Sequence, residues 1–103
     1  MSQKKSIFFV DKNNELLEID ILPIPDWDGF SKILKFLEQN YDAKIIESFD
    51  GIGSRRCKLL IENNTVELVH DDLYGNSLRS ISSHDIAIVK TIGKDLEERL
   101  KNI

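Results

Sequence analysis

The first part of the chain alternates between apolar and polar side chains with the period of a β-strand. In residues 16–22 one side is apolar and the other acidic, with Leu17, Ile19 and Ile21 set against Glu18 and Asp20. This is the pattern of a half-buried strand. An apolar run at residues 7–10 precedes it, and a polar turn at 11–14 separates the two. We expect the two segments to pair as a hairpin that ends at Pro23 and Pro25, because proline cannot donate to a strand ladder.

Two later segments carry apolar residues at helical spacing. The first follows Asp26 or Asp28, either of which can cap a helix. The second follows Ser82 or Ser83, where Ser82 and Asp85 resemble a capping box. The stripes are Trp27, Phe30, Ile33, Leu34, Leu37 and Tyr41 in the first helix, and Asp85, Val89, Ile92, Leu96 and Leu100 in the second. Gly93 is expected to weaken the second helix by about 1 kcal/mol.

Between the helices, residues 44–49, 55–62 and 65–71 have the composition of strands, and 76–81 is a further candidate. A two-residue Asn63-Asn64 loop would pair Glu62 with Thr65. Counting outward then pairs Cys57 with His70, and Arg56 with Asp71 as an ion pair. The side expected to face the core carries Cys57, Leu59, Ile61, Val66, Leu68 and His70.

The predicted order is β-β-α-β-β-β-(β)-α. Strands in hairpin-connected runs favour the α+β class, with an antiparallel sheet of about five to six strands and both helices on one face. Residues 1–103 are expected to form a single domain.

The composition of the chain limits the classes of function that it can have. The chain has 14 basic and 18 acidic residues and a net charge of −4. A nucleic-acid binder needs a basic face, so this balance argues against nucleic acid and suits a basic protein partner. A single cysteine excludes an internal disulfide. Because we see no signal peptide or membrane segment, we expect the cytoplasm and no membrane partner.

Two groups of residues could form a catalytic site or a metal site. Cys57 and His70 could form an activated thiolate pair of a hydrolase, although their neighbours indicate a buried structural pair. Asp71 and Asp72, with His84 and Asp85 further on, are metal-ligand types without a recognised spacing. We therefore expect no catalytic residue, no metal and no cofactor. A small hydrolase, and a structural role that includes self-association through the Leu60–Val69 face or an edge strand, remain alternatives.

Several short motifs carry a resemblance. They are Trp27-Asp28-x-Phe30, Phe49-Asp50-Gly51, Arg56-Cys57 and Val69-His70-Asp71-Asp72-x-Tyr74-Gly75-Asn76-Ser77. The arrangement resembles small bacterial domains with a W-D-x-F helix start and a D-D-x-Y-G-N loop. It is also similar to immunity proteins of contact-dependent growth inhibition systems. The resemblance implies an acidic cytoplasmic protein that neutralises one cognate toxin domain, commonly a nuclease, by occluding its active site.

The resemblance and the acidic loop together suggest where a toxin would bind. We expect contacts from Asp71, Asp72, Tyr74 and Asn76, with Asp50 nearby and Arg56 at the rim. Tyr74 is the expected anchor because it is amphipathic and lies in a loop. The sequence leaves the oligomeric state open.

Overall fold

The structure is a computed structural model that describes residues 7–12 and 16–100 of the chain. The elements, in chain order, are β1 (Ile7–Lys12), β2 (Leu16–Ile21), α1 (Trp27–Tyr41), β3 (Lys44–Gly51), β4 (Ser54–Ile61), β5 (Asn64–Asp71), β6 (Gly75–Ser80), a 3₁₀ turn (Ser83–Asp85) and α2 (Ile86–Leu100). The predicted order is confirmed, and the strand left open in the sequence is β6.

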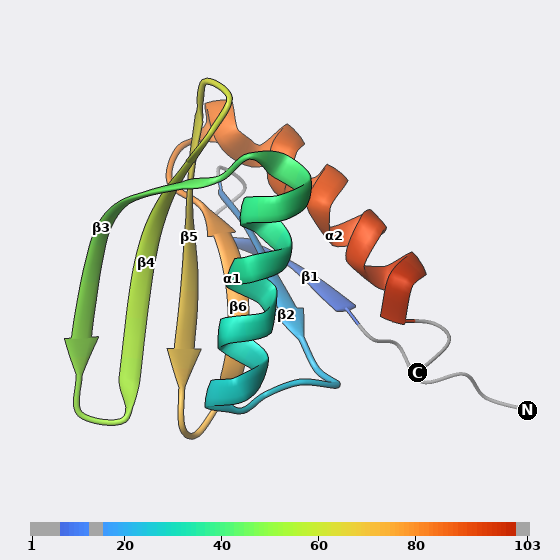
Figure 1. Ribbon diagram of the computed structural model, residues 1–103. Helices are drawn as coiled ribbons and strands as arrows, with labels where there is room; N and C mark the ends of the chain where they lie inside the picture. The colour runs from blue at the N-terminus through green and yellow to red at the C-terminus, as the bar shows by residue number, and fades with distance from the viewer. Residues whose placement is uncertain (1–6, 13–15, 101–103) are drawn as a thin grey trace, which may run out of the picture.

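The described strands form one six-stranded antiparallel sheet in the order β1-β2-β6-β5-β4-β3 (Figure 1). β6 lies between β2 and β5. It therefore joins the N-terminal hairpin to the β3-β4-β5 meander, which places residues far apart in the sequence side by side.

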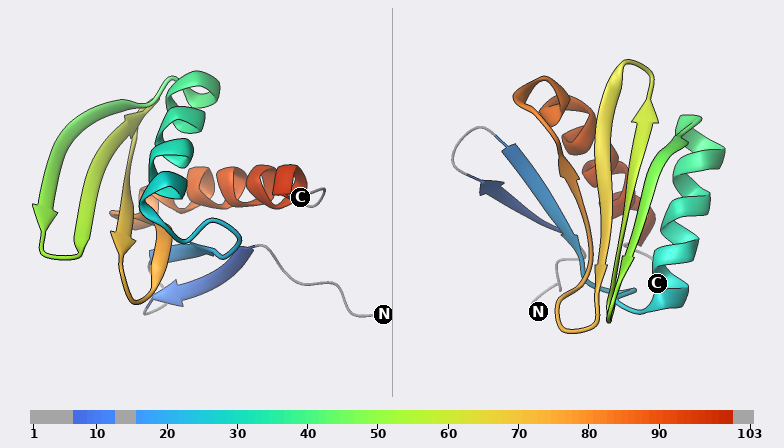
Figure 2. Two further views of the ribbon diagram at one scale, coloured as in Figure 1. Left: turned by 60° about the horizontal axis from the view of Figure 1, so that its bottom comes forward. Right: turned by 90° about the vertical axis from the view of Figure 1, so that its left-hand side faces the viewer.

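Both helices pack on the same face of this sheet, as predicted (Figure 2). α1 contacts β5, while α2 crosses β1, β2 and β6. The core between the layers is made by alternate strand residues and the inner sides of the helices. Its fully buried members include Ile19, Ile21, Leu59, Ile61, Val66, Leu68, Leu78, Phe30, Ile33, Leu37, Val89 and Ile92. We call the opposite side of the sheet the open face, because no helix of the described residues covers it.

Local signals explain where the helices begin and end. The Asp26 carboxylate accepts a 2.7 Å hydrogen bond from the Gly29 amide, which identifies Asp26 as the cap of α1. Asp42 ends that helix in the left-handed conformation, with φ of 53°. Before α2, the Ser82 amide and hydroxyl both donate to Asp85 Oδ2 at 3.0 Å. The predicted capping box is therefore present, and it closes a 3₁₀ turn that leads into α2.

Gly93 has a packing role in addition to its cost in helix propensity. A Cβ atom there would lie 2.7 Å from Cε2 of Phe9 and 3.2 Å from Cγ2 of Ile19. The missing side chain lets α2 approach β1 and β2 closely.

The register of the β4-β5 hairpin differs from the prediction by two residues. The loop is Glu62-Asn63, with φ of 56° at Glu62, and Ile61 pairs with Asn64. The Thr65 amide donates to Asp85 Oδ1 at 2.9 Å, so it is not available to close a Glu62–Thr65 pair. A shift of two residues keeps every side chain on its predicted face. The expected cross-strand partners are wrong: Cys57 lies opposite Leu68, and Arg56 lies opposite Val69.

β3 is the outer strand beside β4 and is exposed along its whole length. Two adjacent isoleucines of this strand, Ile45 and Ile46, cannot both point towards the core. Ile45 lies opposite Leu59, and a bulge between Ile45 and Glu47 leaves Ile46 without a partner in the ladder. Both isoleucines are about half exposed, because β3 extends beyond the area that α1 covers (Figure 1).

Candidate partner-binding site

The turn between β5 and β6 presents three exposed side chains at one end of the sheet. Asp71 Oδ1 accepts hydrogen bonds from the amides of Leu73 and Tyr74, at 2.8 and 3.2 Å. The turn is closed by Gly75, with φ of 84°, and it points Leu73 and Tyr74 outward with exposures of 86% and 85%. Asp71 therefore shapes the turn, and the two residues after Asp72 form its tip.

His70 connects this turn to the start of α1. The Asn76 amide group donates to the carbonyl oxygens of Ile24 and Asp26, at 2.6 and 3.0 Å. Its Oδ1 therefore faces His70 Nδ1, at 2.8 Å. Since an amide oxygen only accepts, Nδ1 carries the proton. On the other side of the ring, Nε2 lies 2.9 Å from Asp72 Oδ1. The buried imidazole thus fixes Asp72 relative to the core.

Aromatic contacts extend the arrangement across the sheet. The rings of Trp27 and His70 lie 4.1 Å apart, centroid to centroid. The guanidinium carbon of Arg55 also lies near Trp27, 5.3 Å from the centroid of the indole. Arg55 Nε donates to Asp50 at 2.7 Å, a bond that raises the pKa of the guanidinium above its usual value. Residues of β3, β4, α1 and β5 therefore meet in one continuous row.

An open hollow of about 480 Å³ lies between the start of α1 and the β5-β6 turn. The residues that line it are Pro25, Asp26, Trp27, His70, Asp72, Leu73, Tyr74 and Gly75. Trp27 is 41% exposed, and the Asp72 carboxylate remains 57% exposed despite its bond to His70. Carboxylates beside aromatic rings suit a guanidinium or ammonium group, through charge and cation–π attraction. We call Asp26, Trp27, Asp72, Leu73 and Tyr74 the end surface.

The structure places the residues suggested by sequence in three settings. Asp50, Asp71, Asp72 and Tyr74 lie at the same end of the sheet. Asn76 is only 2% exposed and holds the backbone together, so its side chain does not reach the surface as expected. Arg56 lies on the open face, opposite Val69, and not at the rim of the hollow.

The part that Trp27 and Arg55 play in this region is not predicted by the helical spacing. That spacing places Trp27 in the apolar stripe of α1, although Trp27 is the first helical residue and lies at the edge of the core. Its position directly after Pro25-Asp26 was the available signal, because a bulky ring in the first turn can project past the end of a helix.

The alternative chemistry does not assemble in the described residues. Cys57 is buried at 3% exposure, and its Sγ lies 3.6 Å from the hydroxyl of Ser48. Both ring nitrogens of His70 are bonded to Asn76 and Asp72, so the expected Cys57–His70 pair is not formed. The expected Arg56–Asp71 ion pair is also wrong, because Asp71 lies opposite Ser54. Within residues 7–12 and 16–100, no group of three or more histidine, cysteine or acidic residues is placed to hold a metal.

A comparison of the chain with family models, with curated proteins and with solved structures finds no match in any of the three. Among the described residues, no helix has the length and apolar character of a membrane span. The geometry of the end surface therefore carries the functional argument.

Proposed function

We propose that this protein is a binding module that holds a basic protein partner against its end surface. The observation that carries the proposal is the hollow lined by the exposed Asp72 carboxylate together with the rings of Trp27 and Tyr74. Large aromatic residues beside a shallow hollow are typical of the centre of a protein interface.

The hollow fits an arginine or lysine side chain of the partner. Asp26 uses Oδ1 to cap α1, and Asp72 Oδ1 lies 2.9 Å from His70 Nε2. Each carboxylate has a second oxygen for a ligand cation. A cation held over Trp27 or Tyr74 gains about 0.5–2 kcal/mol, depending on how far it is desolvated. Tyr74 can then close over the same side chain, since its ring is almost free of contacts within the chain.

The kind of partner follows from charge and from the resemblance described above. With a net charge of −4, the protein attracts basic proteins and speeds their association. An enzyme that acts on nucleic acid carries a basic cleft, and an acidic protein seated in that cleft blocks its substrate. The proposed role is that of a cytoplasmic immunity protein that neutralises a cognate toxin domain. A nuclease is the simplest toxin with which to probe this role.

The test is co-purification of the protein with the product of the adjacent gene, followed by a growth assay under toxin expression. Asp72→Lys and Tyr74→Ala should each weaken binding at least tenfold and reduce protection. Glu38→Lys on α1 makes the same charge change away from the end surface, and Phe49→Ala removes an exposed ring from β3. Both control variants should bind normally.

The outcomes separate the role from the surface. If the native protein neither binds nor protects, the immunity role is wrong. If the native protein binds, but Asp72→Lys and Tyr74→Ala bind equally well, the end surface is not the interface.

A further inference from the structure

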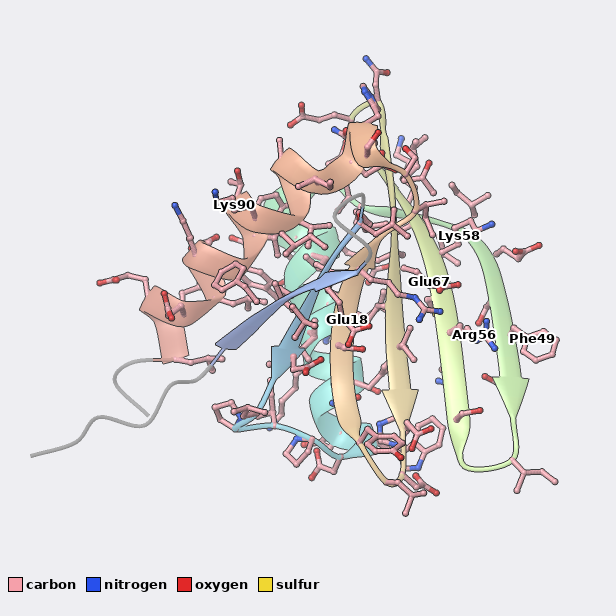
Figure 3. All side chains as sticks on the ribbon, turned by 180° about the vertical axis from the view of Figure 1, so that it is seen from behind. Glu18, Phe49, Arg56, Lys58, Glu67 and Lys90 are labelled. Atoms are coloured by element: carbon pink, nitrogen blue, oxygen red, sulfur yellow. The ribbon has the colours of Figure 1, made fainter. Side chains whose placement is uncertain are left out.

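The open face carries a row of charges that alternate in sign across the sheet. The cross-strand registers place Glu18 beside Arg79, Arg79 beside Glu67, and Glu67 beside Lys58, and then Glu47 follows on β3. Arg79 Nε donates to Glu67 at 2.8 Å, and Lys58 Nζ lies 3.6 Å from Glu47. Figure 3 shows Glu18, Glu67 and Lys58 spread across this face. The row thus begins with an acid on β2 and reaches a base on β4.

A second row lies one step further along the strands. It consists of Asp20, Ser77, Val69, Arg56 and Phe49, again in register from β2 to β3. Within the described residues, neither the Asp20 carboxylate nor the Arg56 guanidinium has a hydrogen bond or an ion pair. Arg56 lies beside the 65% exposed ring of Phe49 and helps to line a hollow of about 200 Å³ (Figure 3). Among the described residues, the open face therefore displays an unpaired acid, Asp20, and an unpaired base, Arg56, three strands apart.

The positions of these charges are symmetric about the middle of the sheet. In the order β1-β2-β6-β5-β4-β3, the centre falls between β6 and β5. β2 and β4 are equally far from it on opposite sides. A two-fold axis parallel to the strands, lying just outside the open face, therefore sets β2 of one copy over β4 of another.

We propose that the open face binds the open face of a second copy of this chain about such an axis. Asp20 then meets Arg56 of the second copy, and the contact occurs twice. In the first row, Glu18 meets Lys58 of the second copy, and Arg79 meets Glu67 of the second copy. A two-fold axis perpendicular to the strands would instead stack β4 on β4 and oppose like charges.

The same packing covers the apolar side chains of this face. Leu60 is 39% exposed, and Val69 is partly buried between the two unpaired charges. Six strands spaced about 4.8 Å apart and about 20 Å long present roughly 550 Å² in projection. The accessible area of the side chains is larger, so the face approaches the roughly 800 Å² per partner of a standard interface. The end surface lies outside this contact, so the inference does not depend on the proposed function.

Charge reversal at Asp20 and at Arg56 gives a sharp test, because neither substitution breaks a side-chain bond to another described residue. The native protein should sediment as a dimer at micromolar to millimolar concentration. Asp20→Lys alone and Arg56→Glu alone should each weaken the dimer at least tenfold, since each sets two pairs of like charges in contact. An equimolar mixture of the two variants should form heterodimers again, because both contacts then join opposite charges.

Lys35→Glu is the matched control. It makes the same charge change as Arg56→Glu, but on the exposed side of α1, and it should leave the dimer intact. Circular dichroism of each variant establishes that the fold is retained. A native protein that is monomeric at millimolar concentration would overturn the inference. So would variants that remain dimeric, or a mixture that stays as monomeric as its components.

Discussion

The indole of Trp27 lies against the imidazole of His70, with 4.1 Å between the ring centroids and 40° between their planes. One ring belongs to the first turn of α1 and the other to β5, so the contact joins the two layers at the end of the sheet. His70 is buried, whereas Trp27 is 41% exposed. Trp27 therefore covers the histidine on one side and faces solvent on the other.

Trp27 should report directly on partner binding, because it is the single tryptophan of the sequence. Seating a partner on the end surface removes water from the indole. We expect its emission to shift to shorter wavelength and saturate as the partner is titrated. Asp72→Lys should remove the shift in the same concentration range, whereas Glu38→Lys should keep it. An unchanged spectrum during demonstrated binding would place the interface elsewhere.

Asn76→Ala should destabilise the fold by about 2–4 kcal/mol, because it leaves several polar groups without partners. The Ile24 carbonyl loses the Asn76 donor and His70 Nδ1 loses its acceptor, while the Asp26 carbonyl keeps only its bond from the Phe30 amide. Urea denaturation measures the free energy of unfolding. The matched control is Asn40→Ala, which removes one exposed bond to the Phe36 carbonyl and should cost well under 1 kcal/mol. Equal effects for the two variants would contradict the structural role of Asn76.

Gly29→Ala should cost about 1–3 kcal/mol although alanine is the better helix former. A Cβ atom at Gly29 would overlap the carbonyl oxygen of Ile24 and approach its carbonyl carbon to 2.9 Å. The Ile24 carbonyl is part of the backbone and is held by Asn76, so it cannot move aside freely. Ser31→Ala, at an exposed position of the same helix, should be neutral or slightly stabilising. Thermal unfolding of the two variants measures the change in stability, which should be a loss for Gly29→Ala but not for Ser31→Ala.

Stability should fall in strong alkali through Tyr41. Burial, followed by the 2.6 Å hydrogen bond to Asp95, raises the pKa of Tyr41 to about 12 from its usual 10.0. The folded state therefore holds this proton more tightly than the unfolded state. The contribution is complete below pH 10 and is lost as the pH rises towards 12. Tyr41→Phe should cost about 1–2 kcal/mol at neutral pH and flatten this decline.

The same hydrogen bond also affects stability at low pH, through Asp95. The Tyr41 hydrogen bond lowers the pKa of Asp95 below its usual 3.8, so its contribution is present above that pH and is lost on further acidification. Tyr74→Phe removes a hydroxyl from an exposed tyrosine and should leave both limbs of the stability profile unchanged. A native profile that is flat between pH 10 and 12 would contradict the assignment.

Cys57 should react slowly with a thiol reagent in the native protein. At 3% exposure, the sulfur is reached only when β4 opens, so alkylation should be at least about a hundredfold slower than in denaturant. Iodoacetamide labelling followed by mass spectrometry measures the rate. Rapid labelling near neutral pH, in a protein shown to be folded, would revive the hydrolase alternative.

Local patterns predicted most of this fold because the strands and helices obey them. The alternation around Ile19 and Leu68 and the helical spacing around Phe30 and Ile92 gave the element order, the faces and the core. The hairpin register could not be predicted in this way. It depends on the bond between Thr65 and Asp85, which lie 20 residues apart and whose contact follows from the packing of the last helix.

The candidate site was predicted only in part for the same reason. The turn residues Asp72 and Tyr74 could be recognised from local composition. The burial of Asn76 depends on carbonyl groups 50 and 52 residues away. The exposure of Trp27 depends on where the sheet ends beneath α1. A short stretch of sequence specifies neither these long-range contacts nor the position at which the sheet ends.

The bulge at Ile46 has a consequence for the behaviour of the protein at high concentration. Outer strands with many apolar residues are the usual templates for fibril growth, and β3 carries Ile45, Ile46 and Phe49. An inserted residue disturbs the even spacing of amide and carbonyl groups that an incoming chain would have to match. The bulge therefore makes β3 a poorer template for fibril growth than its apolar side chains alone would suggest.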